Sequence, residues 1–355
     1  MKKLLIYIDS LNNSGGIERI VYELIKEWKS FISVSVLTKD NGACYYGDLG
    51  DICIASIGCS RKINMHNRLQ RIFSTLINTA LSIVKLRKNK LDFDFFYVTT
   101  PMNGLELYLA GVDSKKIIVS EHGSAYGVNR VYKSIKKFLY PKVKCVSVPN
   151  TMDIKYYSML GANVIYIPHL LYLKNRMRSL LNSKVLLNCG RLTADKRQLL
   201  LLKIWSTISD KNGWSLVIVG SGEEKKNLEK FIDDNQLHNS VSLLPAQKNI
   251  EKFYQNASCF VFTSRYEGFG LVLLEAMSYG LPCISFDCPS GPRDIINNKN
   301  GFLVNNNNID ELKNRIIQLI NMSKSDLLTF GDNAYFFANS WNNDLIIKKW
   351  KDLFK

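Results

Sequence analysis

Short apolar runs alternate along the chain with stretches that have helical periodicity. In the first half the runs are bounded by polar turns, which is typical of buried strands, and they occupy residues 3–8, 31–38, 94–100, 116–122 and 143–149. Helical patterns lie between them, for example over 16–28 and 66–88. This alternation predicts a parallel β-sheet covered by helices on both faces.

The same alternation restarts in the second half. Residues 169–184 are basic and lack a strand pattern, so we interpret them as a connection between domains. Beyond them, apolar runs followed by helical stretches occupy residues 184–190, 215–222, 240–245, 258–264 and 282–286. We therefore expect an α/β protein with two doubly wound, Rossmann-like domains, 1–168 and 185–335, that face a cleft, and a closing amphipathic helix at 336–355.

Size and composition agree with two globular domains. At 355 residues the chain exceeds the usual size of a single core, and 46% apolar with 22% charged residues is ordinary for a folded protein. The sequence has no run of 18 apolar residues and no signal-peptide core, so we predict a cytoplasmic protein. The eight cysteines show no CxxC pair, and no His/Cys/carboxylate cluster has metal-ligand spacing, so no bound metal is expected.

Positive charge is concentrated in the first half of the chain. The net charge is +16, and residues 1–184 contain 27 Lys and Arg against 13 Asp and Glu. Such an excess favours an anionic partner, which is a nucleic acid, a phosphorylated substrate or an acidic membrane surface.

Residues that directly follow strands are the first candidates for a site, because open parallel sheets bind ligands beyond the carboxyl ends of their strands. Gly15 and Gly16 follow the first strand and open a helix, where backbone N–H groups can approach a phosphate. Glycine pairs also occur at such turns for steric reasons alone. His122 ends another strand and is a candidate to hold a polar substrate group, although a lone histidine is usually structural.

Two further candidates follow strands in the second half. Arg191 and Lys196 come after the run 184–190, and two cations at the end of a strand can neutralise a diphosphate without a metal. A solvated basic loop is the alternative. Gly220 and Ser221 follow the next strand, where backbone contact with a ligand and a simple flexible turn both remain open.

The stretch 264–280, SRYEGFGLVLLEAMSYG, has a glutamate at each end of an apolar run. Gly268 and Gly270 can offer N–H donors at a helix N-terminus, and Glu275 can accept hydrogen bonds from the vicinal hydroxyls of a ribose. Two solvated glutamates are the alternative, which fits Glu275 poorly because apolar residues flank it.

Taken in order, the segments GGIER, EHG, GRLTADK, VGSGEE, SRYEGFGLVLLEA and SGPRDII resemble the family-4 retaining glycosyltransferases of the GT-B fold. The resemblance covers nearly the whole chain and is strongest over 185–305. Glu267 and Glu275 fit that family's Glu-x7-Glu signature. Two departures are visible, because Asp294 stands where the family more often has Glu and 243–249 lacks a glycine often found in its base-binding turn.

The resemblance implies a role for each matching position. Arg191 and Lys196 would bind the donor diphosphate and stabilise its leaving charge. Glu275 would hold the ribose hydroxyls, whereas Glu267 and His122 would contact the transferred sugar. Further donor contacts would come from Gly15, Gly16, Gly190, Gly220, Ser221, Gly268, Phe269, Gly270 and Leu271.

The resemblance also implies the reaction. The enzyme would be a hexosyltransferase that moves a hexose or N-acetylhexosamine from a nucleotide sugar, with UDP favoured, to a lipid-linked or saccharide acceptor and retains the anomeric configuration. Bacterial surface-polysaccharide assembly (O-antigen, capsule or lipopolysaccharide) is the expected setting, and no cofactor is needed. Two alternatives are a GT-B-fold nucleotide-sugar epimerase and a basic nucleic-acid-binding protein, although RRM, KH and helix-turn-helix patterns are absent from the sequence.

A basic helix points to a membrane. Residues 52–91 contain eight Lys and Arg and no Asp or Glu, and 130–144 add six more. Within 66–88 the apolar residues form a single helical stripe. Beside it lie Arg68, Arg71, Lys85, Arg87 and Lys88. The stripe can pack on its own sheet and leave the basic flank exposed, and we predict that this flank holds the protein reversibly at the inner face of the cytoplasmic membrane.

Overall fold

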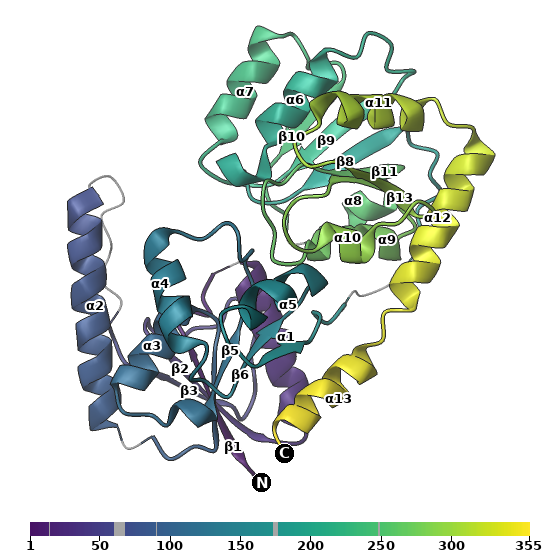
Figure 1. Cartoon of the computed structure of the whole chain (residues 1–355). Helices are drawn as coiled ribbons and strands as arrows, with labels where there is room; N and C mark the ends of the chain where they lie inside the picture. The colour runs from purple at the N-terminus through teal and green to yellow at the C-terminus, as the bar shows by residue number, and fades with distance from the viewer. Residues whose placement is uncertain (14, 60–67, 90, 173–176, 248) are drawn as a thin grey trace. The chain divides into compact units, whose positions relative to one another are not determined.

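The structure, a computed structural model of the chain, describes residues 1–13, 15–59, 68–89, 91–172, 177–247 and 249–355. They form two compact units (Figure 1). The first unit combines Met1–Leu170 with Asn343–Lys355, and the second is Leu171–Asn342. Each unit is built on a parallel sheet, which confirms the predicted α/β fold.

The sheet of the first unit has the strand order β3-β2-β1-β4-β5-β6-β7, and its paired strands all run parallel. The strands are β1 Lys3–Ile8, β2 Ser33–Thr38, β3 Cys53–Ser56, β4 Phe95–Val98, β5 Ile117–Ser120, β6 Cys145–Val148 and β7 Val164–Tyr166. Inner strands such as β4, FFYV, are buried along their whole length, because helices cover both faces of the sheet.

Helices of the first unit divide between the two faces of its sheet. They are α1 Gly16–Trp28, α2 Arg68–Lys88, α3 Pro101–Leu109, α4 Arg130–Leu139, α5 Thr151–Ser158 and α13 Asn343–Leu353, with a 3-10 turn at Ser114–Lys116. Right-handed crossovers put α1 on one face and α2 to α5 on the other. Leu86 of α2, Leu107 of α3 and Leu139 of α4 accordingly belong to one apolar cluster.

The apolar stripe of α2 does not pack as a whole on the sheet. Ser82 and Leu86 are buried, whereas Phe73, Leu76 and Val84 are exposed. The N-terminal end of the helix extends past the sheet, so only the C-terminal part has a surface to pack against (Figure 1). The alternative that the whole stripe packs on its own sheet is therefore wrong for Phe73, Leu76 and Val84.

The sheet of the second unit has the order β10-β9-β8-β11-β12-β13. Its strands are β8 Val185–Cys189, β9 Ser215–Val219, β10 Val241–Leu244, β11 Cys259–Phe262, β12 Cys283–Phe286 and β13 Gly301–Val304. From β8 the chain first fills one side of the sheet and then returns to β11 on the other side. Ligands of such sheets bind where the strand order reverses in this way, here between β8 and β11.

Helices of the second unit connect its strands on both sides of the switch point between β8 and β11. They are α6 Gln198–Ser206, α7 Lys225–Asp234, α8 Glu251–Gln255, α9 Leu271–Ser278, α10 Pro292–Ile295, α11 Ile309–Ile320 and α12 Lys324–Asn339, with a 3-10 turn at Ala194–Lys196. Gly270 begins the turn into α9 with a φ of 85°, a left-handed conformation that glycine adopts without strain. The switch point is thus bordered by a 3-10 turn after β8 and a helix N-terminus after β11.

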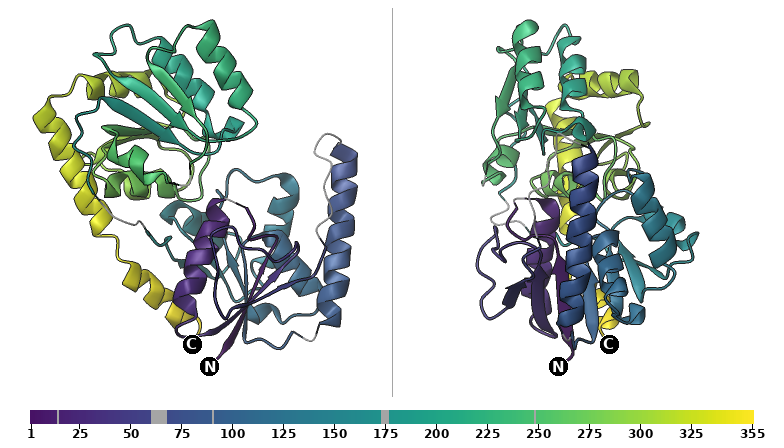
Figure 2. Two further views of the ribbon diagram at one scale, coloured as in Figure 1. Left: turned by 180° about the vertical axis from the view of Figure 1, so that it is seen from behind. Right: turned by 90° about the vertical axis from the view of Figure 1, so that its left-hand side faces the viewer.

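The C-terminal residues form two helices rather than the one expected over 336–355. The first, α12, belongs to the second unit, and the second, α13, belongs to the first (Figure 2). Trp350 of α13 packs on Trp28 of α1 with ring centroids 5.0 Å apart, and Phe354 lies 5.3 Å from the same indole. These aromatic contacts account for the return of the chain to its first unit.

The expected connection 169–184 also differs from a linker. Residues from Leu171 onward belong to the second unit, where the Ser179 amide donates to the Tyr279 carbonyl at 2.9 Å and Arg178 pairs with Asp332. The basic character of this segment is therefore used in part for contacts within the unit.

Removal of the Trp350 side chain, which packs α13 on α1, should destabilise the first unit. We expect Trp350→Ala to lower its free energy of unfolding by about 3–5 kcal/mol, because the buried indole leaves a cavity beside Trp28. Urea unfolding followed by circular dichroism measures this. Phe336→Ala is the control, because that ring is 65% exposed and its loss should cost less than about 0.5 kcal/mol. Equal, small losses in both variants would contradict the anchoring role.

Candidate active site

The loops after β8 and β11 meet through an ion pair at the switch point. Nζ of Lys196, in the loop after β8, pairs with Oε1 of Glu267, in the loop after β11. The two side chains are only 21% and 12% exposed, so water screens this pair less than a surface ion pair. The hydroxyl of Thr263 donates to the Lys196 carbonyl at 2.9 Å and fixes the same loop. The structure thus brings together two residues that the sequence indicated separately.

Arg191 lies in the loop after β8 as well. Its side chain is exposed, and the guanidinium has no hydrogen-bond or ion-pair partner in the described part of the chain. The backbone is held, because the side-chain amide of Gln198 donates to the Arg191 carbonyl at 3.0 Å. An anion at this edge of the sheet would therefore meet one unpaired cation and one that is already neutralised by Glu267.

Glu275 is buried on α9, with 4% of its surface exposed. Its carboxylate accepts a hydrogen bond from the Tyr254 hydroxyl at 3.1 Å. Burial, and then the Glu275 charge, raise the pKa of the Cys189 thiol at the end of β8, which locates the carboxylate near the switch point. The alternative of two solvated glutamates is wrong for this residue.

The glycines of the second unit serve two different purposes. The N–H of Gly190 donates to a β9 carbonyl at 3.1 Å, and that of Gly220 donates to a β10 carbonyl at 2.9 Å. A Cβ at Gly220 would lie 2.0 Å from the Gly190 carbonyl oxygen, so glycine is needed there for the two loops to pack. The Ser221 hydroxyl accepts from the Ala246 N–H at 3.1 Å. Donor contacts through the amides of Gly190 and Gly220 are therefore not available.

The loop 268–271 presents a helix N-terminus instead. Gly270 is the N-cap of α9, and Leu271 is the first residue of this helix. N–H groups at such a position have no partner within the helix and carry a partial positive charge. Phe269 is buried and packs on the Trp341 ring, with centroids 5.6 Å apart, which holds the preceding turn in place.

The Gly15-Gly16 pair in the first unit lacks a steric explanation. Gly16 is the first residue of α1, and a Cβ there would meet no atom within 4 Å. At Gly15 a Cβ would meet the flexible side chain of Glu18, and neither glycine has a positive φ. Packing does not require glycine at Gly16, and the backbone geometry requires it at neither position.

His122 follows β5 in a stack of two imidazoles. Its ring lies 5.2 Å from the ring of His169, at an interplanar angle of 11°, and its Nε2 lies 3.3 Å from the Tyr97 hydroxyl. Nδ1 is buried and has no partner among the described residues. Burial lowers the pKa of His122 to about 4, so the imidazole is neutral near pH 7. Burial and then the neighbouring His122 lower the pKa of His169 as well.

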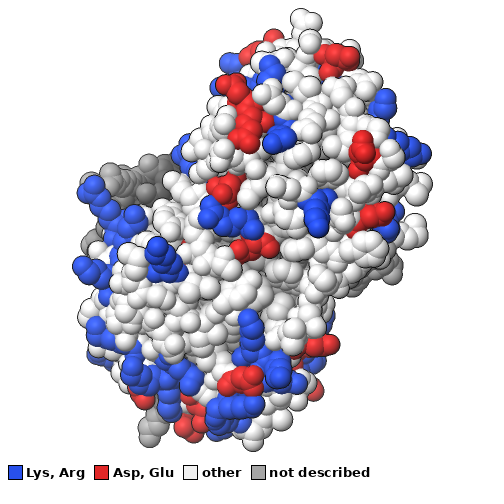
Figure 3. Space-filling view, turned by 45° about the vertical axis from the view of Figure 1, so that its right-hand side comes forward, with Lys and Arg blue, Asp and Glu red and all other residues white. Residues whose placement is uncertain are grey.

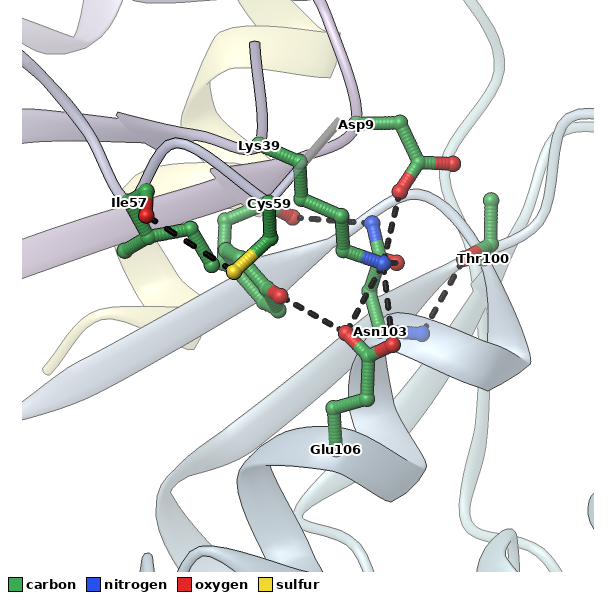
Figure 4. Close-up of polar contacts among 8 residues, drawn as sticks. Asp9, Lys39, Ile57, Cys59, Thr100, Asn103 and Glu106 are labelled. Atoms are coloured by element: carbon green, nitrogen blue, oxygen red, sulfur yellow. Dashed lines mark hydrogen bonds and ion pairs between the residues drawn. The ribbon is translucent and has the colours of Figure 1, made fainter. Parts of the chain in front are cut away.

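A charge cluster at the ends of β1 and β2, in which Glu106 is buried and Asp9 is exposed, was not anticipated from the sequence (Figure 4). Nζ of Lys39 lies 2.9 Å from Asp9, 2.8 Å from Glu106 and 2.9 Å from the side-chain oxygen of Asn103. The Tyr7 hydroxyl donates to Glu106 at 2.6 Å. Asp9 and Lys39 each directly follow a strand, and this position is the signal that could have identified them.

Asn188 and Tyr254 were not identified from the sequence either. The side-chain amide of Asn188, within buried β8, donates to the Val261 carbonyl of β11 at 2.8 Å and fastens the two strands beside the switch point. An asparagine inside the apolar run VLLNCG is the signal that could have identified it. Nothing in the local sequence marks Tyr254 as the partner of Glu275.

Comparisons with known proteins agree with this geometry. Residues 174–335 match the family described as Glycosyl transferases group 1. The amylovoran biosynthesis glycosyltransferase AmsD of Erwinia amylovora is 28% identical over 366 residues, which cover 99% of each chain. The solved structure of TarM matches with a TM-score of 0.83 and 18% identity over 100% of this chain and 99% of that one. HepE of Anabaena in complex with UDP and glucose matches with a TM-score of 0.78 and 17% identity over 99% of both chains.

The fold is therefore that of the GT-B glycosyltransferases, as the sequence predicted. The part of the chain that matches the group 1 glycosyl transferases, residues 174–335, falls in the second unit. Neither the family nor the curated relative supports the two alternatives, an epimerase and a nucleic-acid-binding protein.

The paired histidines should make stability depend on pH. Unfolded histidine takes up a proton below about pH 6.5, whereas folded His122 does so only near a pKa of about 4. Protons thus bind preferentially to the unfolded state in this window, so stability falls as the pH falls from 6.5 towards 4. We expect His122→Gln and His169→Gln to show a shallower fall than the wild type in urea unfolding.

His238→Gln is the matched control for this measurement. His238 is exposed and pairs with Asp233 at 2.9 Å, so its removal should leave the steep part of the pH dependence in place. A pH profile that is identical in wild type, His122→Gln and His169→Gln would show that neither ring has a lowered pKa in the folded protein.

Proposed function

We propose that this protein is a retaining glycosyltransferase that moves a hexose or N-acetylhexosamine from a UDP-sugar to a lipid-linked or saccharide acceptor. The observation that carries the proposal is the set of charges at the switch point of the second sheet. Unpaired Arg191 and the Lys196–Glu267 pair lie beside the N-terminus of α9 and buried Glu275. A diphosphate, a sugar and a ribose need this combination of cations, N–H groups and carboxylates.

The cations support stabilisation of the leaving group. As the bond between sugar C1 and the diphosphate breaks, negative charge grows on the diphosphate oxygens. Fixed cations and helix N–H groups stabilise that charge without reorganisation of solvent. Arg191 is available at once, whereas Lys196 is shared with Glu267, so the diphosphate would compete with this carboxylate for the ammonium group.

Glu267 and Glu275 support separate roles. Glu275 is held by Tyr254 and can accept from the ribose hydroxyls, whereas Glu267 is positioned by Lys196 to accept from a sugar hydroxyl. Attack of the acceptor hydroxyl on C1 from the side of the leaving group forms the new glycosidic bond. The hydroxyl proton passes to the departing diphosphate, so retention requires no covalent protein nucleophile.

Two features of the first unit are consistent with sugar-diphosphate binding. Gly16 leaves open space at the start of α1, where the backbone can approach the diphosphate. His122 is neutral and has a buried Nδ1 without a partner in the described residues, so the ring can exchange a hydrogen bond with a sugar hydroxyl. Phosphate neutralisation by Arg191 and Lys196 needs no metal, and we propose that the reaction proceeds without one.

The names of similar proteins support a role in polysaccharide assembly. AmsD is named for amylovoran biosynthesis, and another relative, 32% identical over 197 residues, is a Staphylococcus aureus poly(ribitol-phosphate) α-N-acetylglucosaminyltransferase. The HepE structure contains UDP and glucose. By analogy, we propose that this chain uses a UDP-sugar in the assembly of a bacterial surface polysaccharide, such as O-antigen, capsule or lipopolysaccharide.

Release of free nucleoside diphosphate from a panel of nucleotide sugars tests the function. We expect slow release from a UDP-sugar, also in the presence of EDTA, and a loss of about 100-fold or more in Arg191→Ala. Gly16→Ala should lose about 10-fold or more, because the added methyl displaces the diphosphate. Its stability should be unchanged or higher by up to about 1 kcal/mol, since alanine favours the helix.

Lys230→Ala is the matched control, because Lys230 is another exposed cation of the second unit and lies on α7. It should release the diphosphate at the wild-type rate. Normal rates in both Arg191→Ala and Gly16→Ala would sink the proposed donor site, and conversion of the UDP-sugar without diphosphate release would favour the epimerase.

We also propose that the first unit binds the inner face of the cytoplasmic membrane through α2 and α4. Phe73 and Leu76 of α2 are 66% and 62% exposed, and Val131 of α4 is 62% exposed. Exposed basic residues accompany them, namely Lys88 on α2 and Lys133 on α4. The side chains of Arg68 and Arg71, which belong to the predicted basic flank, lie outside the described residues.

This face combines the two features of an interfacial surface. Apolar groups on α2 and α4 can enter the headgroup region beside exposed lysines of the same helices. Figure 3 shows many Lys and Arg side chains over the first unit, with Asp and Glu among them. No helix in the described ranges is apolar enough over its length to cross a membrane. Peripheral binding would bring the enzyme to a lipid-linked acceptor.

Co-sedimentation with liposomes measures this binding. Anionic vesicles should retain the protein at low salt and release it at high salt, whereas neutral vesicles should not retain it. Phe73→Ser with Leu76→Ser should weaken retention, while Leu328→Ser, on α12 of the second unit, should not. Equal recovery with neutral and anionic vesicles would contradict the proposal.

A further inference from the structure

A cation-lined pocket of about 400 Å³ lies in the second unit, outside the set of residues described above for the donor. Its charged lining residues are Arg197, Lys203, Arg265 and Glu224, so three cations face one carboxylate. The lining comes from the turn before α6, from α6 itself, from the segment before α7, from the loop after β11 and from the start of α11. Neither Arg191 nor the Lys196–Glu267 pair is part of it.

Arg197 is held in an unfavourable conformation at the wall of this pocket. Its φ of 58° is left-handed, which a residue with a side chain rarely adopts, and it is the N-cap of α6. One guanidinium nitrogen donates to the side-chain oxygen of Asn307, but Nη1 is buried and has no partner among the described residues. Burial, and then the charge of nearby Arg265, lower the pKa of Arg197. Arg197 thus combines backbone strain with an unsatisfied donor and like-charge repulsion in its side chain.

The other cations of the pocket are not neutralised either. Lys203 and Arg265 are exposed, and neither makes an ion pair with a carboxylate in the part of the chain that the structure describes. Glu224 is the acidic lining residue, and its carboxylate accepts from the Asn227 side chain at 3.1 Å. A solvated basic surface has cations that point apart into water, whereas here three of them line one concavity.

We propose that this pocket binds an oxyanion of the phosphate class, either a free phosphate monoester or the phosphate group of a larger molecule. The exposed side chains of Lys203 and Arg265 would donate to a tetrahedral oxyanion, whose charge would also offset the repulsion between Arg197 and Arg265. Guanidinium forks match the spacing of phosphate oxygens, whereas lysine adds a point charge.

Isothermal titration of the full chain in chloride buffer tests the proposal, with inorganic phosphate, glycerol 3-phosphate and dihexanoyl phosphatidic acid as probes. Lys203→Gln combined with Arg265→Gln should weaken binding by about 10-fold or more, since each charge-assisted bond contributes strongly. Arg197→Gly should do the same and should fold at least as well as the wild type, because glycine adopts the left-handed conformation without strain. Similar affinity for the two soluble probes and the lipid would identify the free monoester as the ligand, and tighter lipid binding would identify a headgroup.

Arg191→Gln separates this pocket from the donor site. Phosphate can also bind the cations of the donor site, so this variant should retain the binding that Arg197→Gly loses. Wild-type affinity in both Arg197→Gly and the double variant would overturn the proposal. Loss of all phosphate binding in Arg191→Gln alone would do so too, because the donor cations would then be the binding site.

Discussion

The Lys196–Glu267 ion pair is the interaction on which the candidate site depends. It joins the loop after β8 to the loop after β11, where the strand order of the second sheet reverses. Both side chains are mostly buried, so removing one partner leaves a desolvated charge on the other. The pair also sets the state of the site before a donor arrives. Lys196 is neutralised and Arg191 is not, so the first attraction for a diphosphate comes from Arg191, while Lys196 is reached by displacing Glu267.

The fold could be predicted from the sequence wherever a strand is covered on both faces. The strands β3, β7 and β13 were not predicted, and each lies at the edge of its sheet. An edge strand has a neighbour on one side only, so it does not need the continuous apolar run that marks a buried strand. The fourth edge strand, β10, is nevertheless largely apolar and was predicted. The residues of β3 are exposed or half-buried, and those of β7 are all half-buried. The split of the C-terminal segment into α12 and α13 depends on the contact between Trp350 and Trp28, which no local pattern contains.

The site residues also divide into features that the sequence predicted and features that it did not. Arg191, Lys196 and His122 were identifiable because they directly follow strands, and parallel strands bring their carboxyl ends to one edge. The pairing of Lys196 with Glu267 joins residues 71 positions apart, and the hydrogen bond from Tyr254 to Glu275 spans 21. Such partners are set by tertiary packing, so the sequence supplied the candidates but not their mutual contacts. Gly220 is the opposite case. The sequence made it a candidate ligand contact, but packing against the Gly190 loop explains why glycine is needed there.

The net charge of the first half does not show where its charged side chains lie. Some lysines are paired within the first unit, and others are exposed on its helices. Two lysines near the carboxyl edge of its sheet are neutralised inside the protein, Lys39 by Glu106 and Asp9, and Lys136 by Glu121 at 2.9 Å. A buried ion pair that keeps its partners is electrically close to neutral at a distance, so these lysines add little to the field outside. The basic excess of the first half is therefore expressed on the outward surfaces of helices such as α2 and α4. The anionic membrane proposed above as a partner of this unit would therefore meet its positive charge on the outward surfaces of these helices.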